Sequence, residues 1–171
     1  AGTSNSGGNY DFAVVRYNAN GSLDTGFNGS GKLVTDINGA SSDQGNSVTV
    51  QADGKIVVAG TSRGGGYRDF AVVRYNANGT LDADFGTGGK LVTDIGSGTF
   101  DEGHSVTVQA DGKIVVAGTS TSGGGNFAVV RYHTDGSLDT RFGAGPAANT
   151  LGGAVAYTEN ASAIALDASV A

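Results

Sequence analysis

Short apolar bursts alternate with glycine- and asparagine-rich stretches along the chain. Ser47–Gln51 alternates polar residues with valines, as a strand with one covered face does. Lys55–Gly60 follows an Asp-Gly turn and is apolar on both faces, which indicates a strand covered on both sides. FAVVRYN at 70–76 has the same pattern, and KLVTDI at 32–37 follows a longer loop. Because no 3.6-residue apolar period is sustained, we predict many short strands and almost no helix.

The chain is built from one repeated unit. DFAVVRYNANG begins at Asp11 and again at Asp69, and a third copy, FAVVRY, begins at Phe127. VQADGKIVVAGTS occurs at 50–62 and at 108–120, and the first four residues, AGTS, are the end of the same phrase. We place the units at about 1–58, 59–116 and 117–145. Repeats of this kind bury their apolar faces against their neighbours.

The repeat predicts an all-β fold of the β-propeller type. Each unit offers four antiparallel strands, of which the middle two are covered on both faces, as in blades that stack around an axis. A β-sandwich would alternate more cleanly in every strand, and a β-solenoid would show a shorter period. The innermost strand is expected to place Ser47, Thr49 and Gln51 toward the channel. The chain then holds about 2.5 to 3 four-stranded blades.

Three phrases, DGKIVVAG, FAVVRYNANGSLDTGF and SVTVQADG, carry a family resemblance. They resemble the delta-60 type bacterial repeat, a propeller-like family that occurs in tandem in large secreted or surface proteins. The resemblance covers about residues 1–145. It implies an extracellular or cell-surface location and brings no enzymatic activity with it.

The tail, residues 146–171, begins at the only proline, Pro146, and does not match the repeat. Its phrases VAYTEN and ALDASV resemble the opening of cadherin-like or immunoglobulin-like modules of bacterial adhesins. Two segments, GGAVAYTEN and SAIALDASV, have strand-like patterns. We expect the tail either to complete the last blade, to donate a strand to a neighbour, or to be disordered.

Only the middle unit carries all four strands, since the first lacks its innermost strand and the last lacks its outermost strand. A propeller needs at least four blades to close. Unpaired edges and uncovered faces are therefore expected to bind copies of the chain, in a closed ring or a filament, or to be completed by sequence of a longer parent protein. The chain has no methionine, so we expect a processed form or a piece of something larger.

Composition removes several classes of function. The net charge of −6 and the ten scattered basic residues argue against nucleic acid. No apolar run approaches membrane-spanning length, and the absence of cysteine excludes disulfides and thiolate metal sites. A carbohydrate or a protein at a surface is a further expected partner, although nothing in the sequence selects sugar, peptide or lipid as the ligand.

The turn NANGSLD offers candidate calcium ligands, because Ca²⁺ takes closely spaced oxygen atoms. The alternative is turn chemistry alone, in which Asx side chains cap the backbone. The candidate ligands in the three units are Asn18, Asn20 and Asp24; Asn76, Asn78 and Asp82; and Asp135 and Asp139, with Ser22, Thr80, Asp84 and Ser137 beside them.

His104 stands where the preceding unit has Asn46, so one unit departs from the repeat. With Asp101 and Ser105 nearby, His104 is the best candidate for a general base, although the members of a triad meet only in three dimensions. Recurrent Arg16, Arg74 and Arg131 are expected to pair with a recurrent carboxylate such as Asp36 or Asp94. The function expected is a self-associating structural or interaction module without enzymatic activity; the alternatives are a filament- or ring-forming subunit and a hydrolase using His104.

Overall fold

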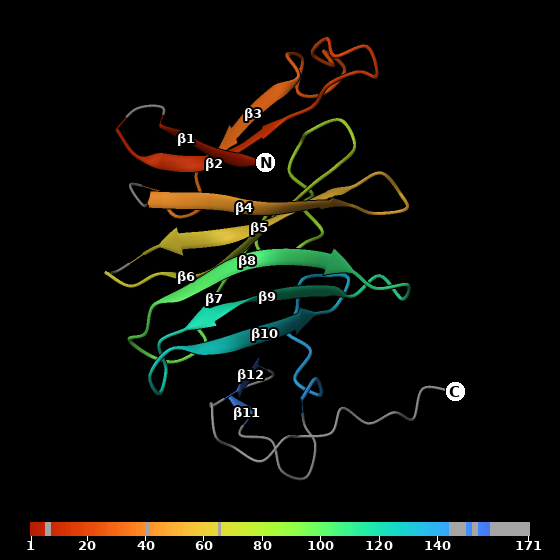
Figure 1. The fold of residues 1–171 in the computed structure, drawn as a ribbon. Coiled ribbons are helices and arrows are strands. Elements are labelled where there is room, and N and C mark those ends of the chain that lie inside the picture. The colour runs from red at the N-terminus through yellow and green to blue at the C-terminus, as the bar shows by residue number, and fades with distance from the viewer. Residues whose placement is uncertain (6–7, 40–41, 65, 144–149, 152–153, 158–171) are drawn as a thin grey trace.

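The computed structural model describes residues 1–171 except 6–7, 40–41, 65, 144–149, 152–153 and 158–171. Three antiparallel sheets are stacked one above another, from the first at the top to the third at the bottom (Figure 1). The first sheet contains β1 (Gly2–Asn5), β2 (Tyr10–Val15) and β3 (Lys32–Thr35) in that order; the middle sheet contains β4 (Ser42–Val50), β5 (Ile56–Arg63), β6 (Asp69–Tyr75) and β7 (Lys90–Thr93).

The third sheet has the order β11-β12-β10-β9-β8, from β8 (Asp101–Val108), β9 (Ile114–Ser120), β10 (Asn126–Tyr132), β11 (Thr150–Leu151) and β12 (Ala154–Tyr157). β12 pairs antiparallel with β10, in the place that β7 takes in the middle sheet. Part of the tail therefore lies at the fourth-strand position, which is one of the roles expected for it. The rest of the tail, with SAIALDASV, lies outside the described residues.

The all-β blade prediction is confirmed by the middle sheet, which has all four strands in chain order. β5 and β6 are almost entirely buried, as strands covered on both faces must be. No helix long and apolar enough to cross a membrane occurs in the described part of the chain.

The innermost strand is longer than its sequence pattern indicates. β4 begins at Ser42, five residues ahead of the expected start, because its pairing with β5 shifts register between Gly45 and Ser47. The bulge leaves Asn46 out of the pairing, and a side chain on Gly60 opposite it would lie 1.8 Å from the Gln44 carbonyl oxygen. Only glycine fits at position 60, so the AG that ends KIVVAG in the repeat marks the place where the bulged strand meets the next strand.

The expected channel position of Ser47 is wrong. Ser47 is half-buried against the third sheet, where its Oγ accepts a hydrogen bond from the backbone N–H of Val106 at 3.2 Å. The side chains of a stacked sheet point toward the sheets above and below it, so Ser47 meets the next blade, and it is the edge of β4 that can face an axis.

Candidate functional site at the sheet faces

Each sheet has two chemically different faces. The phenylalanine face takes its residues from alternate positions of the third repeat strand and from the loop after it. The tyrosine face takes the positions between them. The equivalent positions on the phenylalanine face are Phe12, Val14 and Phe27 in the first sheet, Phe70, Val72 and Phe85 in the middle sheet, and Phe127, Val129 and Phe142 in the third; on the tyrosine face they are Ala13, Val15 and Tyr17, then Ala71, Val73 and Tyr75, then Ala128, Val130 and Tyr132.

The hydrophobic core lies between sheets. The phenylalanine face of the first sheet packs on the tyrosine face of the middle sheet, and the middle and third sheets meet in the same way. Phe12 and Phe70 are both 0% exposed at these two junctions. Burial of such a side chain stabilises a fold by about 1.5–3 kcal/mol, so each junction is a strong apolar contact.

A hydrogen bond recurs at both junctions. The hydroxyl of Tyr75 donates to Thr35 Oγ1 of the first sheet at 2.8 Å, and that of Tyr132 donates to Thr93 Oγ1 of the middle sheet at 2.8 Å. Burial raises the pKa of Tyr75 to about 12, and its hydrogen bond to Thr35 lowers it by less. The pKa of Tyr132 is raised for the same reason. Both phenols are therefore held neutral as donors, which fixes how one sheet sits on the next.

A recurrent arginine makes a second type of bond across each junction. Arg74 Nε donates to Asp82 Oδ2 at 2.7 Å, its guanidinium lies 4.5 Å from the ring centre of Phe85, and its Nη1 donates to the Thr134 carbonyl of the third sheet at 2.5 Å. Burial raises the pKa of Asp82, but hydrogen bonds from the Asp84 backbone, from a lysine and from Arg74 outweigh it, and the net pKa is lowered. The carboxylate therefore stays charged and orients the arginine.

The expected partner of this arginine is wrong, although the expectation of a recurrent carboxylate was right. Arg16 pairs with Asp24 at 2.7 Å and Arg131 with Asp139 at 2.9 Å, in the same way as Arg74 and Asp82. Each carboxylate follows its arginine by eight residues, across the NANG turn of the first two units or the HTDG turn of the third, and the bonded turn brings it back beside the arginine. Asp36 and Asp94 lie elsewhere, in the acidic clusters described below.

The two ends of the stack present uncovered versions of these faces. Tyr17 is 61% exposed, whereas Tyr75 and Tyr132 at the same repeat position are 1% exposed. Phe127 is 74% exposed, whereas Phe12 and Phe70 are fully buried. The first sheet therefore leaves a tyrosine face open, and the third sheet leaves a phenylalanine face open.

An uncovered strip also lies on the innermost strand of the middle sheet. Val48 and Val50 are 43% and 63% exposed, whereas Val106, the counterpart of Val48, is 8% exposed under β4. The difference arises because the first sheet has no strand beyond β1 among its described residues, where an innermost strand would cover these valines. The β1 edge and the two valines together form a vacant strand position.

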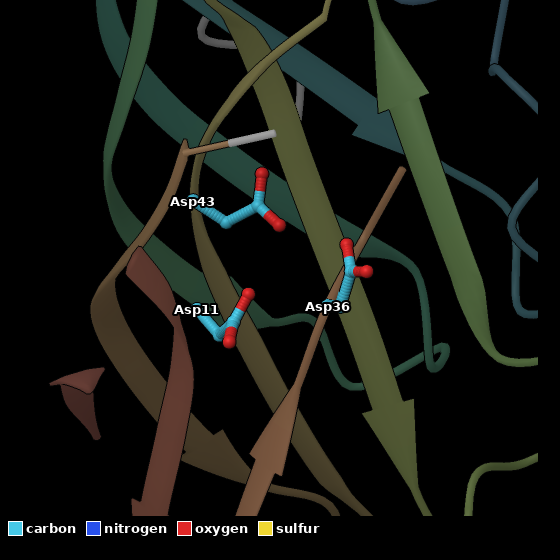
Figure 2. A group of neighbouring side chains, drawn as sticks. All are labelled: Asp11, Asp36 and Asp43. Carbon is cyan, nitrogen blue, oxygen red and sulfur yellow. The ribbon is translucent and has the colours of Figure 1, made fainter. Parts of the chain in front are cut away.

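Two clusters of three aspartates lie at the sheet junctions. Asp11, Asp36 and Asp43 bring carboxylate oxygens within 4.8 Å of one another, and Figure 2 shows their side chains around a common space. The equivalent cluster, 58 residues later, is Asp69, Asp94 and Asp101. Burial, together with the charges of Asp36 and Asp43, raises the pKa of Asp11, and burial with Asp94 and Asp101 raises that of Asp69.

Comparison with known families agrees with this architecture. Residues 1–27, 51–85 and 109–142, together more than half of the chain, match the family described as a domain of unknown function (DUF5122) beta-propeller. The chain belongs to the DUF5122 beta-propeller family. No curated protein matches it. The propeller repeat expected from the sequence is thereby confirmed at the level of the DUF5122 family, whereas the delta-60 name and the adhesin-like tail stay predictions.

The DUF5122 turns that offered calcium ligands are bonded internally. Asn20 Oδ1 accepts hydrogen bonds from the N–H and the hydroxyl of Ser22, at 3.0 and 2.7 Å, and Asn18 Nδ2 donates to the Leu23 carbonyl at 3.2 Å. Asn76, Asn78 and Thr80 repeat these bonds, and Asp135 and Ser137 repeat the Asn20 part. Turn chemistry accounts for these contacts, and calcium binding by the turns stays a prediction.

The structure separates the three candidate hydrolase residues of the third DUF5122 blade. His104 is the bulged residue of β8, and its Nε2 lies 3.3 Å from Thr119 Oγ1, its one hydrogen-bond contact among the described residues. Asp101 is fully buried and accepts bonds from the Ile95 N–H and the Thr99 hydroxyl. Ser105 pairs with β9 beyond the bulge. A His-centred site therefore remains a prediction that these contacts do not support.

Proposed function

We propose that this DUF5122 segment is a structural and interaction module that associates with copies of itself, as part of a large secreted or surface bacterial protein. The supporting observation is the match between its open and its internal faces. The open tyrosine face of the first sheet has the residues that are buried at both internal junctions, and so does the open phenylalanine face of the third sheet. A second copy of the chain offers the complementary face to each.

The contact is directional, because a phenylalanine face binds a tyrosine face and the two differ. Such a head-to-tail contact gives a ring if its rotation closes and a filament if it does not. The filament- or ring-forming subunit is thus the same contact continued through more copies. Arg131 gives the contact a second directional element. Its equivalents Arg16 and Arg74 each donate to a backbone carbonyl of the next sheet, so Arg131 would donate in the same way to the next copy of the chain.

The experiment places a charge on one face at a time. Val15→Asp alters the tyrosine face of the first sheet, and Phe127→Asp alters the phenylalanine face of the third. Ala83→Asp adds the same charge in an exposed loop of the middle sheet and serves as the control. Molar mass is measured by light scattering over a range of concentrations, for each variant alone and for the first two mixed.

We expect the parent and the control to form oligomers, and each face variant alone to be monomeric. Mixing the two face variants restores one intact pair of faces, so a 1:1 dimer that grows no further is expected. A parent that stays monomeric at high concentration contradicts the proposal. So does a mixture that fails to form the dimer while both variants remain folded.

The extracellular location and the adhesin-like tail belong to the same proposal. They are supported by the delta-60 and adhesin-module resemblances. Immunoblotting of the surface, medium and cytoplasmic fractions of the source bacterium tests the location. Detection only in the cytoplasm contradicts it.

A further inference from the structure

The cluster of Asp11, Asp36 and Asp43 joins two sheets. Asp11 lies on β2 and Asp36 directly follows β3, both in the first sheet, whereas Asp43 lies on β4 of the middle sheet. Their carboxylate oxygens all lie within 4.8 Å of one another (Figure 2). Three negative charges therefore meet at the junction that the apolar faces form.

Asp11 is the member of this cluster that points to a ligand. It is only 8% exposed, and within the described part of the chain no protein group donates a hydrogen bond to its carboxylate or pairs with it, although its oxygens still reach solvent. A largely buried carboxylate without a protein partner costs free energy, so such groups are normally bonded to water or bound to metal. The charges that face it are those of Asp36 and Asp43, which are repulsive.

The neighbouring cation does not fill this role. Lys90 Nζ donates to the backbone carbonyl of Asp36 at 2.6 Å and forms no ion pair with the cluster's described carboxylates. Asp43 is held in place by the Ile37 N–H at 2.8 Å and the Ser62 hydroxyl at 2.7 Å. The cluster therefore has one fixed carboxylate and one buried, unbonded carboxylate around the same space.

The spacing admits a calcium ion, and the geometry that calcium tolerates favours it over magnesium. Ca²⁺ binds oxygen at about 2.3–2.6 Å, so ligands on opposite sides of the ion are about 4.6–5.2 Å apart. The carboxylate oxygens all lie within 4.8 Å of one another, so one calcium ion can reach them. Ca²⁺ accepts flexible coordination by six to eight oxygens, whereas Mg²⁺ demands near-ideal octahedral geometry. Carboxylates are also the oxygen ligands that Ca²⁺ prefers, with water able to complete the shell.

We propose that Asp11, Asp36 and Asp43 form a calcium site that ties the first sheet to the middle sheet. The ion bridges three carboxylates contributed by two sheets and offsets two of their three negative charges. It therefore stabilises their stacking, independently of whether copies of the chain associate.

The test uses calcium alone as the probe. Because Asp69, Asp94 and Asp101 form the equivalent cluster, all proteins carry Asp69→Asn, so that the signal reports the first cluster. Asp11→Asn is compared with Asp53→Asn, which removes an exposed turn carboxylate outside the clusters. Calcium chloride and magnesium chloride are titrated calorimetrically, and melting temperatures are measured with EDTA and with each metal.

We expect one calcium ion per chain with a dissociation constant of about 10⁻⁴–10⁻³ M, and weaker magnesium binding. A melting temperature that rises by about 3–8 °C in 10 mM calcium is expected to accompany it. Asp11→Asn weakens binding at least tenfold and removes the rise, whereas Asp53→Asn leaves both unchanged. In EDTA the Asp11→Asn protein is at least as stable as its parent, because the repulsion is gone, so loss of binding is not confused with misfolding. Absence of heat and of a melting shift in the parent, or equal binding by Asp11→Asn, overturns the proposal.

Discussion

Truncation of the recurrent phenylalanine distinguishes internal faces from open ones. Phe70 and Phe127 occupy the same position of the repeat and are followed by the same five residues, AVVRY. Phe70 is fully buried between the middle and third sheets, and Phe127 is 74% exposed on the outer face of the third. The same substitution to alanine should therefore have very different effects on the free energy of unfolding.

The magnitudes follow from burial. Phe70→Ala leaves a cavity in the core and is expected to cost about 3–5 kcal/mol, as other buried phenylalanines do. Phe127→Ala removes a side chain that is mostly in water and is expected to change the free energy of unfolding by less than about 0.5 kcal/mol. Because small proteins lose about 1–3 kcal/mol of stability per molar urea, the first variant should unfold at least about 1 M earlier.

The assay is urea unfolding followed by circular dichroism, first at a protein concentration where the chain is monomeric. At higher concentration, where copies associate, Phe127→Ala should raise the dissociation constant of the oligomer about 5- to 30-fold, because about 1–2 kcal/mol of phenylalanine burial is lost. If Phe127→Ala destabilises the monomer as much as Phe70→Ala does, Phe127 is already covered within one chain. The open-face argument is then refuted.

Three further predictions concern polar groups. Burial raises the pKa of Tyr75 from 10 to about 12, so its contribution to the free energy of unfolding is intact below pH 10 and is lost as pH rises toward 12. Tyr75→Phe should lack this alkaline loss of about 2–3 kcal/mol. At neutral pH the same variant should weaken the fold by about 1 kcal/mol, and urea unfolding at neutral pH and near pH 12 measures both effects. The pKa of Asp82 is lowered, so its contribution to stability is present above the ordinary value near 3.8 and is lost as pH falls through the lowered pKa. Asp82→Asn should therefore destabilise the protein at pH 7, measured by urea unfolding, and the difference from the parent should shrink as pH falls below that ordinary value. A difference that stays constant into the acid range would contradict this. An ester- and glycan-hydrolysis screen should detect no turnover that His104→Ala removes, and turnover lost in that variant would revive the hydrolase.

The sequence predicts the strands and their stacking well because both depend on local pattern. Alternation, Asp-Gly and Asn-Gly turns, and two-sided burial place the four repeat strands close to where β4 to β7 lie. The bulge at Asn46 was missed, since it depends on how closely Gly45 and Gly60 approach in space.

The acidic cluster was missed for a different reason. Its members come from two sheets, and the register that brings Asp43 to Asp11 is set by the stacking. One signal was present in the sequence: all three aspartates recur 58 residues later. The arginine partner was misassigned because the turn that returns Asp82 to Arg74 is closed by hydrogen bonds that composition does not show.

The difference between the two faces of every blade also bears on how such proteins change in length. A duplication or deletion of one whole 58-residue unit leaves a phenylalanine face on a tyrosine face at every junction, so the gene can gain or lose blades in one recombination step without a compensating mutation. A change that adds or removes only some strands of a unit places strands of the wrong position side by side, whereas the 57-residue offset from Phe70 to Phe127 shows that a one-residue change is tolerated. Natural arrays of this family should therefore vary in whole units.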